Sequence, residues 1–143
     1  MSGGTGNFKF RLASVLKVAR LREDAERARV AIAAAQEVAA ERRRIERIGA
    51  YEALPPAGAA PARDFEAGRD VADLRARAVS DAEAAKQVAA ERLSAARDEW
   101  LRAARRVKSI EELEERHHAA HAMAAARAAQ RSLDDLARAR RQR

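Results

Sequence analysis

Cysteine is absent from this chain of 143 residues, which excludes a disulfide framework, a zinc site built from thiolates and a cysteine nucleophile. Aromatic residues are almost as scarce, at 3%, and the apolar 48% comes largely from alanine, a side chain that buries little area. A thick hydrophobic core is therefore not expected. Because 36% of the residues are charged, the composition indicates thin paired helices that each bury a single stripe.

The sequence also lacks long hydrophobic runs. No apolar stretch approaches the roughly 20 residues that a membrane-spanning helix needs. Residues 1–7 are small and polar, without the charged and then apolar order of a secretion signal, and we expect them to form a disordered leader. Together with the absence of cysteine, these features predict a cytoplasmic protein.

Proline occurs only at Pro55, Pro56 and Pro61, so two long segments are left free to form helix. We predict a helix over residues 8–50, a proline-rich tip over residues 51–63 and a second helix over residues 64–141. Ser80 and Ser109 each begin a capping-box pattern that allows a break in the second helix, but a continuous helix is favoured. The expected fold is all-α: residues 8–143 form one long two-helix antiparallel coiled-coil hairpin, with the second helix longer than the first.

Apolar residues recur every three or four positions in both segments, which predicts a seam between the helices. In the first segment the predicted seam consists of Val18, Leu21, Ala25, Ala28, Ile32 and Ala35. In the second it consists of Trp100, Ala103, Val107, Ile110 and Leu113, followed by a weaker distal row of Met123, Ala126, Gln130, Leu133 and Leu136. The part of the longer helix beyond about Val107 should have little of the first helix beside it and therefore needs another partner.

Arginine supplies most of the net charge of +7, with basic runs at residues 42–44 and at the carboxyl end. The 22 acidic residues are mixed through the same segments at helical spacings such as Glu23 to Arg27. This mixture favours a solvated face with weak ion pairs over a nucleic-acid surface, which would need a one-sided basic stripe.

A search for catalytic or metal-binding patterns gives little. The glycines near the amino end lack the lysine and hydroxyl residue of a phosphate-binding loop. His117 and His121 share a helix face and could hold a metal, but a solvated segment is the favoured interpretation. Asp134 and Asp135 point in different directions on a helix and do not converge on a substrate. We expect no enzyme activity, metal or cofactor.

The few large apolar residues around the tip, Tyr51, Leu54 and Phe65, have little core in which to be buried. Exposed aromatic residues often anchor protein interfaces, so a partner contact is favoured for these three. For Phe8, Phe10 and Trp100, packing within the hairpin and contact with a partner are equally favoured.

The two ends of the chain carry recognisable motifs. The amino end contains Phe8-x-Phe10-x-Leu12, then Val15-Leu16 and Arg20-x-x-Glu23-Asp24. The far end contains Lys108-x-x-Glu111-x-Leu113-x-x-Arg116 and later Leu133-Asp134-Asp135-Leu136-Ala137. In order and spacing, over nearly the whole chain, these motifs resemble the flagellar export protein family FliJ. The chain departs from the family at Asp135, where glutamate is usual, and in its proline-rich turn.

The resemblance implies a non-enzymatic component of the bacterial flagellar type III export apparatus, similar to the central stalk of rotary ATPases. Such proteins insert their paired termini into the hexameric export ATPase and present the opposite end to the export gate, a membrane protein. They also bind empty export chaperones. The implied location is the cytoplasmic face of the cell membrane, with membrane association through partners.

Under this resemblance, Tyr51, Phe65 and Leu74 are hypothetical gate contacts, and Arg138, Arg140 and Arg141 would lie in an ATPase pore of complementary acidic charge. No nucleic acid is expected as a partner. One alternative is a basic coiled-coil module that binds nucleic acid or an anionic membrane surface. Another is a structural homodimer in which the overhanging helices pair with each other.

Overall fold

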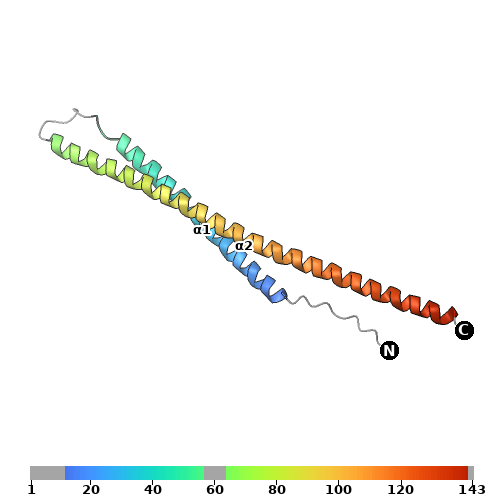
Figure 1. The fold of residues 1–143 in the computed structure, drawn as a ribbon. Coiled ribbons are helices and arrows are strands. Elements are labelled where there is room, and N and C mark those ends of the chain that lie inside the picture. Colours follow the sequence, from blue (N-terminus) through green and yellow to red (C-terminus); the bar gives the residue numbers. More distant parts are fainter. Residues whose placement is uncertain (1–11, 57–63, 142–143) are drawn as a thin grey trace. The chain divides into compact units, whose positions relative to one another are not determined.

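The structure, a computed structural model, describes residues 12–56 and 64–141, and its elements are two helices (Figure 1). Helix α1 spans Ala13–Glu52 with 40 residues, and helix α2 spans Phe65–Arg141 with 77 residues. No strand occurs in the described ranges. The two helices pack against each other and the second is the longer, so the predicted fold class is confirmed. Phe8, Phe10 and the tip residues 57–63 lie outside the described residues.

Helix α1 continues through Gly49 and ends at Glu52, before the prolines that cannot supply a backbone N–H. The last four carbonyl groups of a helix have no partner within it and must be satisfied elsewhere. Three are satisfied here: Gly49 O accepts from Ala53 N–H at 3.0 Å, Tyr51 O from Leu54 N–H at 3.1 Å, and Ala50 O from Arg75 Nη1 at 2.6 Å. The third bond comes from α2 and fixes the end of α1 against it.

Helix α2 is continuous, as predicted, and neither Ser80 nor Ser109 interrupts it. Its first turn carries Glu66 and its last turn carries Arg138, Arg140 and Arg141. Negative charge near the amino end and positive charge near the carboxyl end both favour the helix dipole. The sequence therefore stabilises both ends of this helix through charge.

Contacts divide the chain into two compact units, which are described separately. Unit 1 comprises Met1–Glu23 and Arg102–Arg143, and unit 2 comprises Asp24–Leu101. Each unit contains a part of α1 and a part of α2 that run antiparallel.

The core of unit 1 is one small apolar cluster. Leu16 and Ala19 of α1 and Val107 of α2 are buried, and Ile110 packs against them. At the rim, Arg20 Nη2 lies 2.8 Å from Glu111 Oε1 and joins the two helices. Both side chains of this ion pair are about half exposed, so it contributes less than about 1 kcal/mol.

The core of unit 2 is built from smaller side chains. Its buried apolar residues are Ala33, Ala40, Ala89 and Leu93. Lys86 Nζ lies 3.8 Å from Glu41 Oε2 across the helices. Small residues let the two backbones approach closely, which compensates in contact area for the missing large side chains.

One carboxylate lies within this seam. Glu26 is buried, and Arg29 Nη1 lies 2.8 Å from Glu26 Oε1. The Arg29 side chain is itself largely exposed, so a guanidinium at the rim compensates the buried charge. The seam of α1 is therefore partly polar.

The predicted seam of α1 was wrong in its choice of face. Its members Val18, Leu21 and Ile32 are exposed by 65%, 61% and 59%, and Ala25, Ala28 and Ala35 are exposed as well. The buried row instead runs through Ala19, Glu26, Ala33 and Ala40, which follow one another at heptad spacing. Two heptad rows therefore follow α1, and α2 packs on the row of smaller side chains because it permits closer approach.

The predicted seam of α2 is confirmed. Val107 is buried, and Trp100, Ala103, Ile110 and Leu113 are half-buried. Beyond this seam, every residue from Glu115 to Arg141 is exposed. No described residue of α1 buries this distal part of α2, which we call the distal arm.

The choice of face can be tested by truncating one leucine from each row of α1. Leu16 is 5% exposed and Leu21 is 61% exposed. Leu16→Ala should lower the free energy of unfolding by about 2 kcal/mol because it removes buried contacts from a small cluster. Leu21→Ala should change it by less than about 0.5 kcal/mol. Thermal melts followed by circular dichroism measure both, and equal destabilisation would contradict the observed register.

A second substitution tests the helical conformation of Gly49. This residue lies inside α1, and a Cβ built there meets no atom within 4 Å. Gly49→Ala should therefore stabilise the protein by about 0.5–1 kcal/mol, since alanine loses less backbone entropy in a helix. A lower melting temperature for this variant would show that α1 ends before Gly49.

Candidate functional site: a groove lined by arginine and alanine

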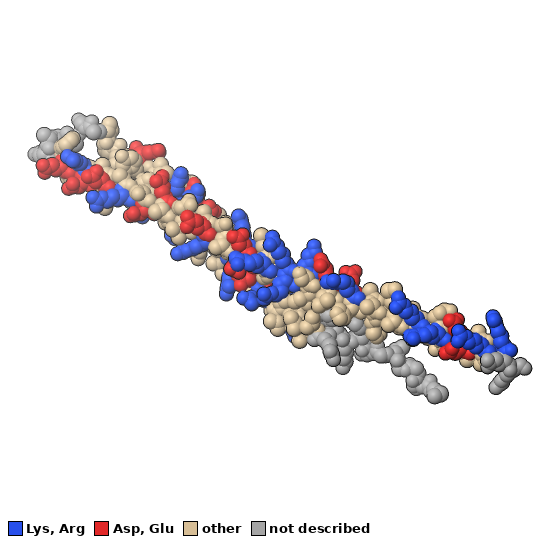
Figure 2. Space-filling model, in the orientation of Figure 1, with Lys and Arg blue, Asp and Glu red and all other residues tan. Residues whose placement is uncertain are grey.

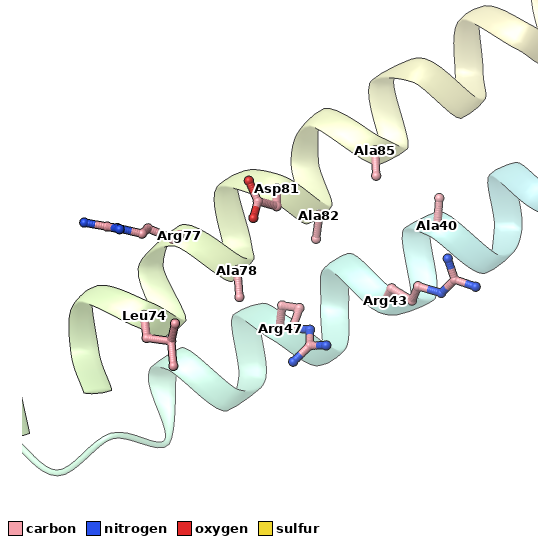
Figure 3. Close-up of a pocket in the computed structure, with 9 residues that line it drawn as sticks. All are labelled: Ala40, Arg43, Arg47, Leu74, Arg77, Ala78, Asp81, Ala82 and Ala85. Carbon is pink, nitrogen blue, oxygen red and sulfur yellow. The ribbon is translucent and has the colours of Figure 1, made fainter. Parts of the chain in front are cut away.

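A groove opens between the two helices of unit 2, near the carboxyl end of α1 (Figure 3). Its volume is about 570 Å³, and it is open to solvent. It is lined by Ala40, Arg43 and Arg47 of α1 and by Leu74, Arg77, Ala78, Asp81, Ala82 and Ala85 of α2. Helix α1 supplies two guanidinium groups and α2 supplies most of the apolar lining.

Alanine produces the hollow. In Figure 3, Ala78, Ala82 and Ala85 project toward α1, and Ala40 projects toward α2. The three alanines of α2 are spaced by four and three residues and so share one face of the helix. A methyl group at each of these positions leaves room that a leucine would fill.

Arg43 and Arg47 lie along α1, one helical turn apart (Figure 3). Neither residue forms an ion pair or a hydrogen bond with any residue in the described part of the chain. Their neighbour Arg44 is engaged, because its Nη1 lies 3.4 Å from Glu41 Oε1. Arg75 is engaged as well, at Ala50 O. The two groove arginines on α1 are thus available to an external acceptor.

Leu74 is the gate-contact candidate that lines this groove. It is 68% exposed and projects toward α1 (Figure 3). Tyr51 lies near the end of α1 and Phe65 is the first residue of α2, and both are exposed. Neither of them lines the groove, so the structure brings only one of the three candidates into it.

Sequence reasoning missed Arg43 and Arg47 as members of a site, because it interpreted residues 42–44 as one basic run. The signal was the four-residue spacing, which puts these two guanidiniums on one helix face. The apolar partner across the groove could not be found without knowing the register of the helices.

The remaining candidates, Arg138, Arg140 and Arg141, lie exposed in the last turn of α2, in the distal arm. Charge is divided unequally along the sequence. The segments of unit 1 contain 16 Lys and Arg against 7 Asp and Glu, a net charge of +9. Unit 2 contains 13 against 15, a net charge of −2. The positive charge of the chain therefore belongs to unit 1.

On the face shown in Figure 2, basic and acidic side chains are interleaved. No group of three or more histidine, aspartate or glutamate side chains among residues 12–56 and 64–141 is placed to hold a metal ion, His117 and His121 included. Neither described helix has a stretch apolar enough to cross a bilayer.

The fold is a two-helix antiparallel coiled coil with a groove between the two helices of unit 2. The family model for the flagellar FliJ protein matches residues 8–143, and the chain therefore belongs to the FliJ family. Curated proteins and solved structures gave no match. The family is a non-catalytic part of the flagellar protein export apparatus, a type III export system, so this chain is a component of that apparatus.

Proposed function

We propose that the chain acts as the central stalk of the export ATPase ring and links that ring to the export gate and to export chaperones. The distal arm carries this proposal. It is exposed from Glu115 to Arg141, ends in three arginines and belongs to a unit with a net charge of +9. A helix of this kind suits the pore of a hexamer lined by acidic groups, where charge complementarity orients it.

Unit 2 carries the residues that we assign to the contact with the export gate. Tyr51, Phe65 and Leu74 are exposed apolar residues near the ends of the helices that flank the tip, and side chains of this kind anchor protein interfaces. We assign them to the export gate. The chain works without catalysis or cofactor and reaches the cytoplasmic face of the membrane through its partners.

Hydrolysis by the export ATPase tests the stalk role. Adding the purified chain at physiological salt should raise ATP hydrolysis and the fraction of ATPase in hexamers. The proposal would be contradicted if the added chain changed neither the fraction of ATPase in hexamers nor the rate of ATP hydrolysis.

A second candidate function follows from the charge of unit 1, which would also attract nucleic acid or an anionic membrane. Binding to phosphates would weaken steeply with salt, by about 0.9 log units per log unit of salt for each phosphate neutralised. A salt titration against duplex DNA and anionic vesicles separates this alternative from ring binding.

Within the stalk proposal, neutralising Arg138, Arg140 and Arg141 to glutamine should raise the concentration needed for half-maximal ATPase stimulation about tenfold, since three exposed charge contacts of about 0.5 kcal/mol each are lost. The matched control changes Arg69, Arg92 and Arg97 to glutamine, which removes the same charge from unit 2. If both triple variants behave alike, net charge rather than the distal arm governs stimulation.

The gate assignment predicts that Phe65→Ala with Leu74→Ala weakens binding to the purified gate at least about tenfold, because two exposed anchors are removed. Helix content should not change, since both side chains are more than half exposed. Val88→Ala with Leu101→Ala removes exposed apolar groups farther along α2 and serves as the control. Unchanged gate affinity for the first pair would exclude these residues from the contact.

A further inference from the structure

We propose that the groove of unit 2 binds a helix of a partner protein that carries two carboxylates one turn apart and a leucine-sized apolar side chain. Arg43 and Arg47 present their guanidiniums from successive turns of α1 (Figure 3). A Glu-x-x-x-Glu pair on a facing helix has the same spacing. Guanidinium and carboxylate match in geometry as well as in charge, because the fork of N–H donors can bind both carboxylate oxygens.

Arg43 and Arg47, like Arg77 on the opposite wall, are available to an external acceptor, whereas three other cations nearby are engaged. Arg44 is paired with Glu41, Arg75 caps the end of α1 and Lys86 faces Glu41. Arg43 and Arg47 have no such acceptor among the described residues. Both are exposed, so they can meet a carboxylate without first breaking an internal bond.

The apolar half of the ligand follows from the opposite wall. Leu74 projects toward α1 beside a floor formed by Ala40, Ala78, Ala82 and Ala85 (Figure 3). The volume of about 570 Å³ admits a few side chains. A leucine of the partner would cover Leu74 and fill the space above the alanine methyl groups, burying apolar area on both sides.

The charge of unit 2 favours a protein over a polyanion. Its net charge of −2 supplies no long-range attraction for a phosphate backbone or an anionic bilayer. Sequence-readable lipid sites contain clusters of about four to eight basic residues, whereas this groove is lined by three arginines, Arg43, Arg47 and Arg77, and by the carboxylate of Asp81. Local pairing with two carboxylates remains favourable because it depends on contact geometry.

The inference adds the chemical class of the ligand to the gate contact proposed for Leu74. It rests on that proposed function only in identifying the export gate as the protein that carries the ligand helix. The chemical class of the ligand comes from the groove itself. A test with a synthetic ligand therefore separates the two ideas, because it needs neither the gate nor the ATPase.

The probe is a fluorescein-labelled alanine-based helical peptide that carries Glu-x-x-x-Glu and a leucine on the same face. Its affinity for the full chain is measured by fluorescence anisotropy at physiological ionic strength. Arg43→Gln and Arg47→Gln should each weaken binding about three- to fivefold. Arg42→Gln removes the same charge from an exposed neighbour that does not line the groove, and it should leave the affinity unchanged. Circular dichroism confirms that the variants keep their helix content.

Two further ligands complete the design: the same peptide with both glutamates changed to glutamine, and vesicles containing one quarter phosphatidylserine. The glutamine peptide should bind more weakly than the glutamate peptide, and the vesicles should not depend on Arg43 or Arg47. The proposal is overturned if Arg42→Gln weakens the glutamate peptide as much as the groove variants do, if the glutamine peptide binds equally well, or if only the vesicles respond to the groove variants. If the unmodified chain stimulates the ATPase but does not bind the glutamate peptide, the proposed groove ligand is wrong and the stalk role is unaffected.

Discussion

The two helices depend on a narrow packing seam in which alanine is the commonest buried residue. Within the described residues no large side chain is fully buried, and the seam of unit 2 consists mostly of alanine. Helices of 40 and 77 residues gain little from such a seam per turn, so their stability comes from its length and from favourable ends. The Arg75 bond to Ala50 O and the basic last turn of α2 are stabilising features of that second kind.

Because the seam is narrow, most of the surface of each helix takes no part in packing between the two helices. Charged residues can occupy the remaining faces at little cost, which is why unit 1 can carry +9 while unit 2 carries −2. In the distal arm every residue is exposed, so all faces of this part of α2 are accessible. A helix that no described residue of its own chain covers is suited to bury surface against another protein, and the proposed place in the ATPase ring supplies that surface.

The sequence was sufficient for the fold class because proline and alanine placement leave few choices. The continuity of α2 followed from the absence of proline beyond Pro61, and its seam around Val107 followed from the spacing of apolar residues. The face of α1 did not, because Val18, Leu21 and Ile32 belong to a seam of three- and four-residue steps that is as regular as the buried row through Ala19 and Ala33. Which row meets α2 depends on how the two helices are rotated against each other, and the spacing within α1 does not give that rotation. The burial of Glu26 was equally hidden, since a carboxylate enters a seam only where a cation such as Arg29 stands at its rim.

The groove, like the buried face of α1, could be predicted only in part from the sequence. Arg43 and Arg47 could be placed on one helix face from their spacing, but their position opposite Leu74 requires the register of the two helices.

The most direct test of the central claim is photo-crosslinking from the distal arm, with p-benzoylphenylalanine placed at Ala137 and, as a comparison, at Ile32. The stalk account predicts that the probe at position 137 crosslinks to subunits of the assembled export ATPase far more than the probe at position 32. Crosslinking to the ATPase from position 32 alone, or from neither position, would contradict it.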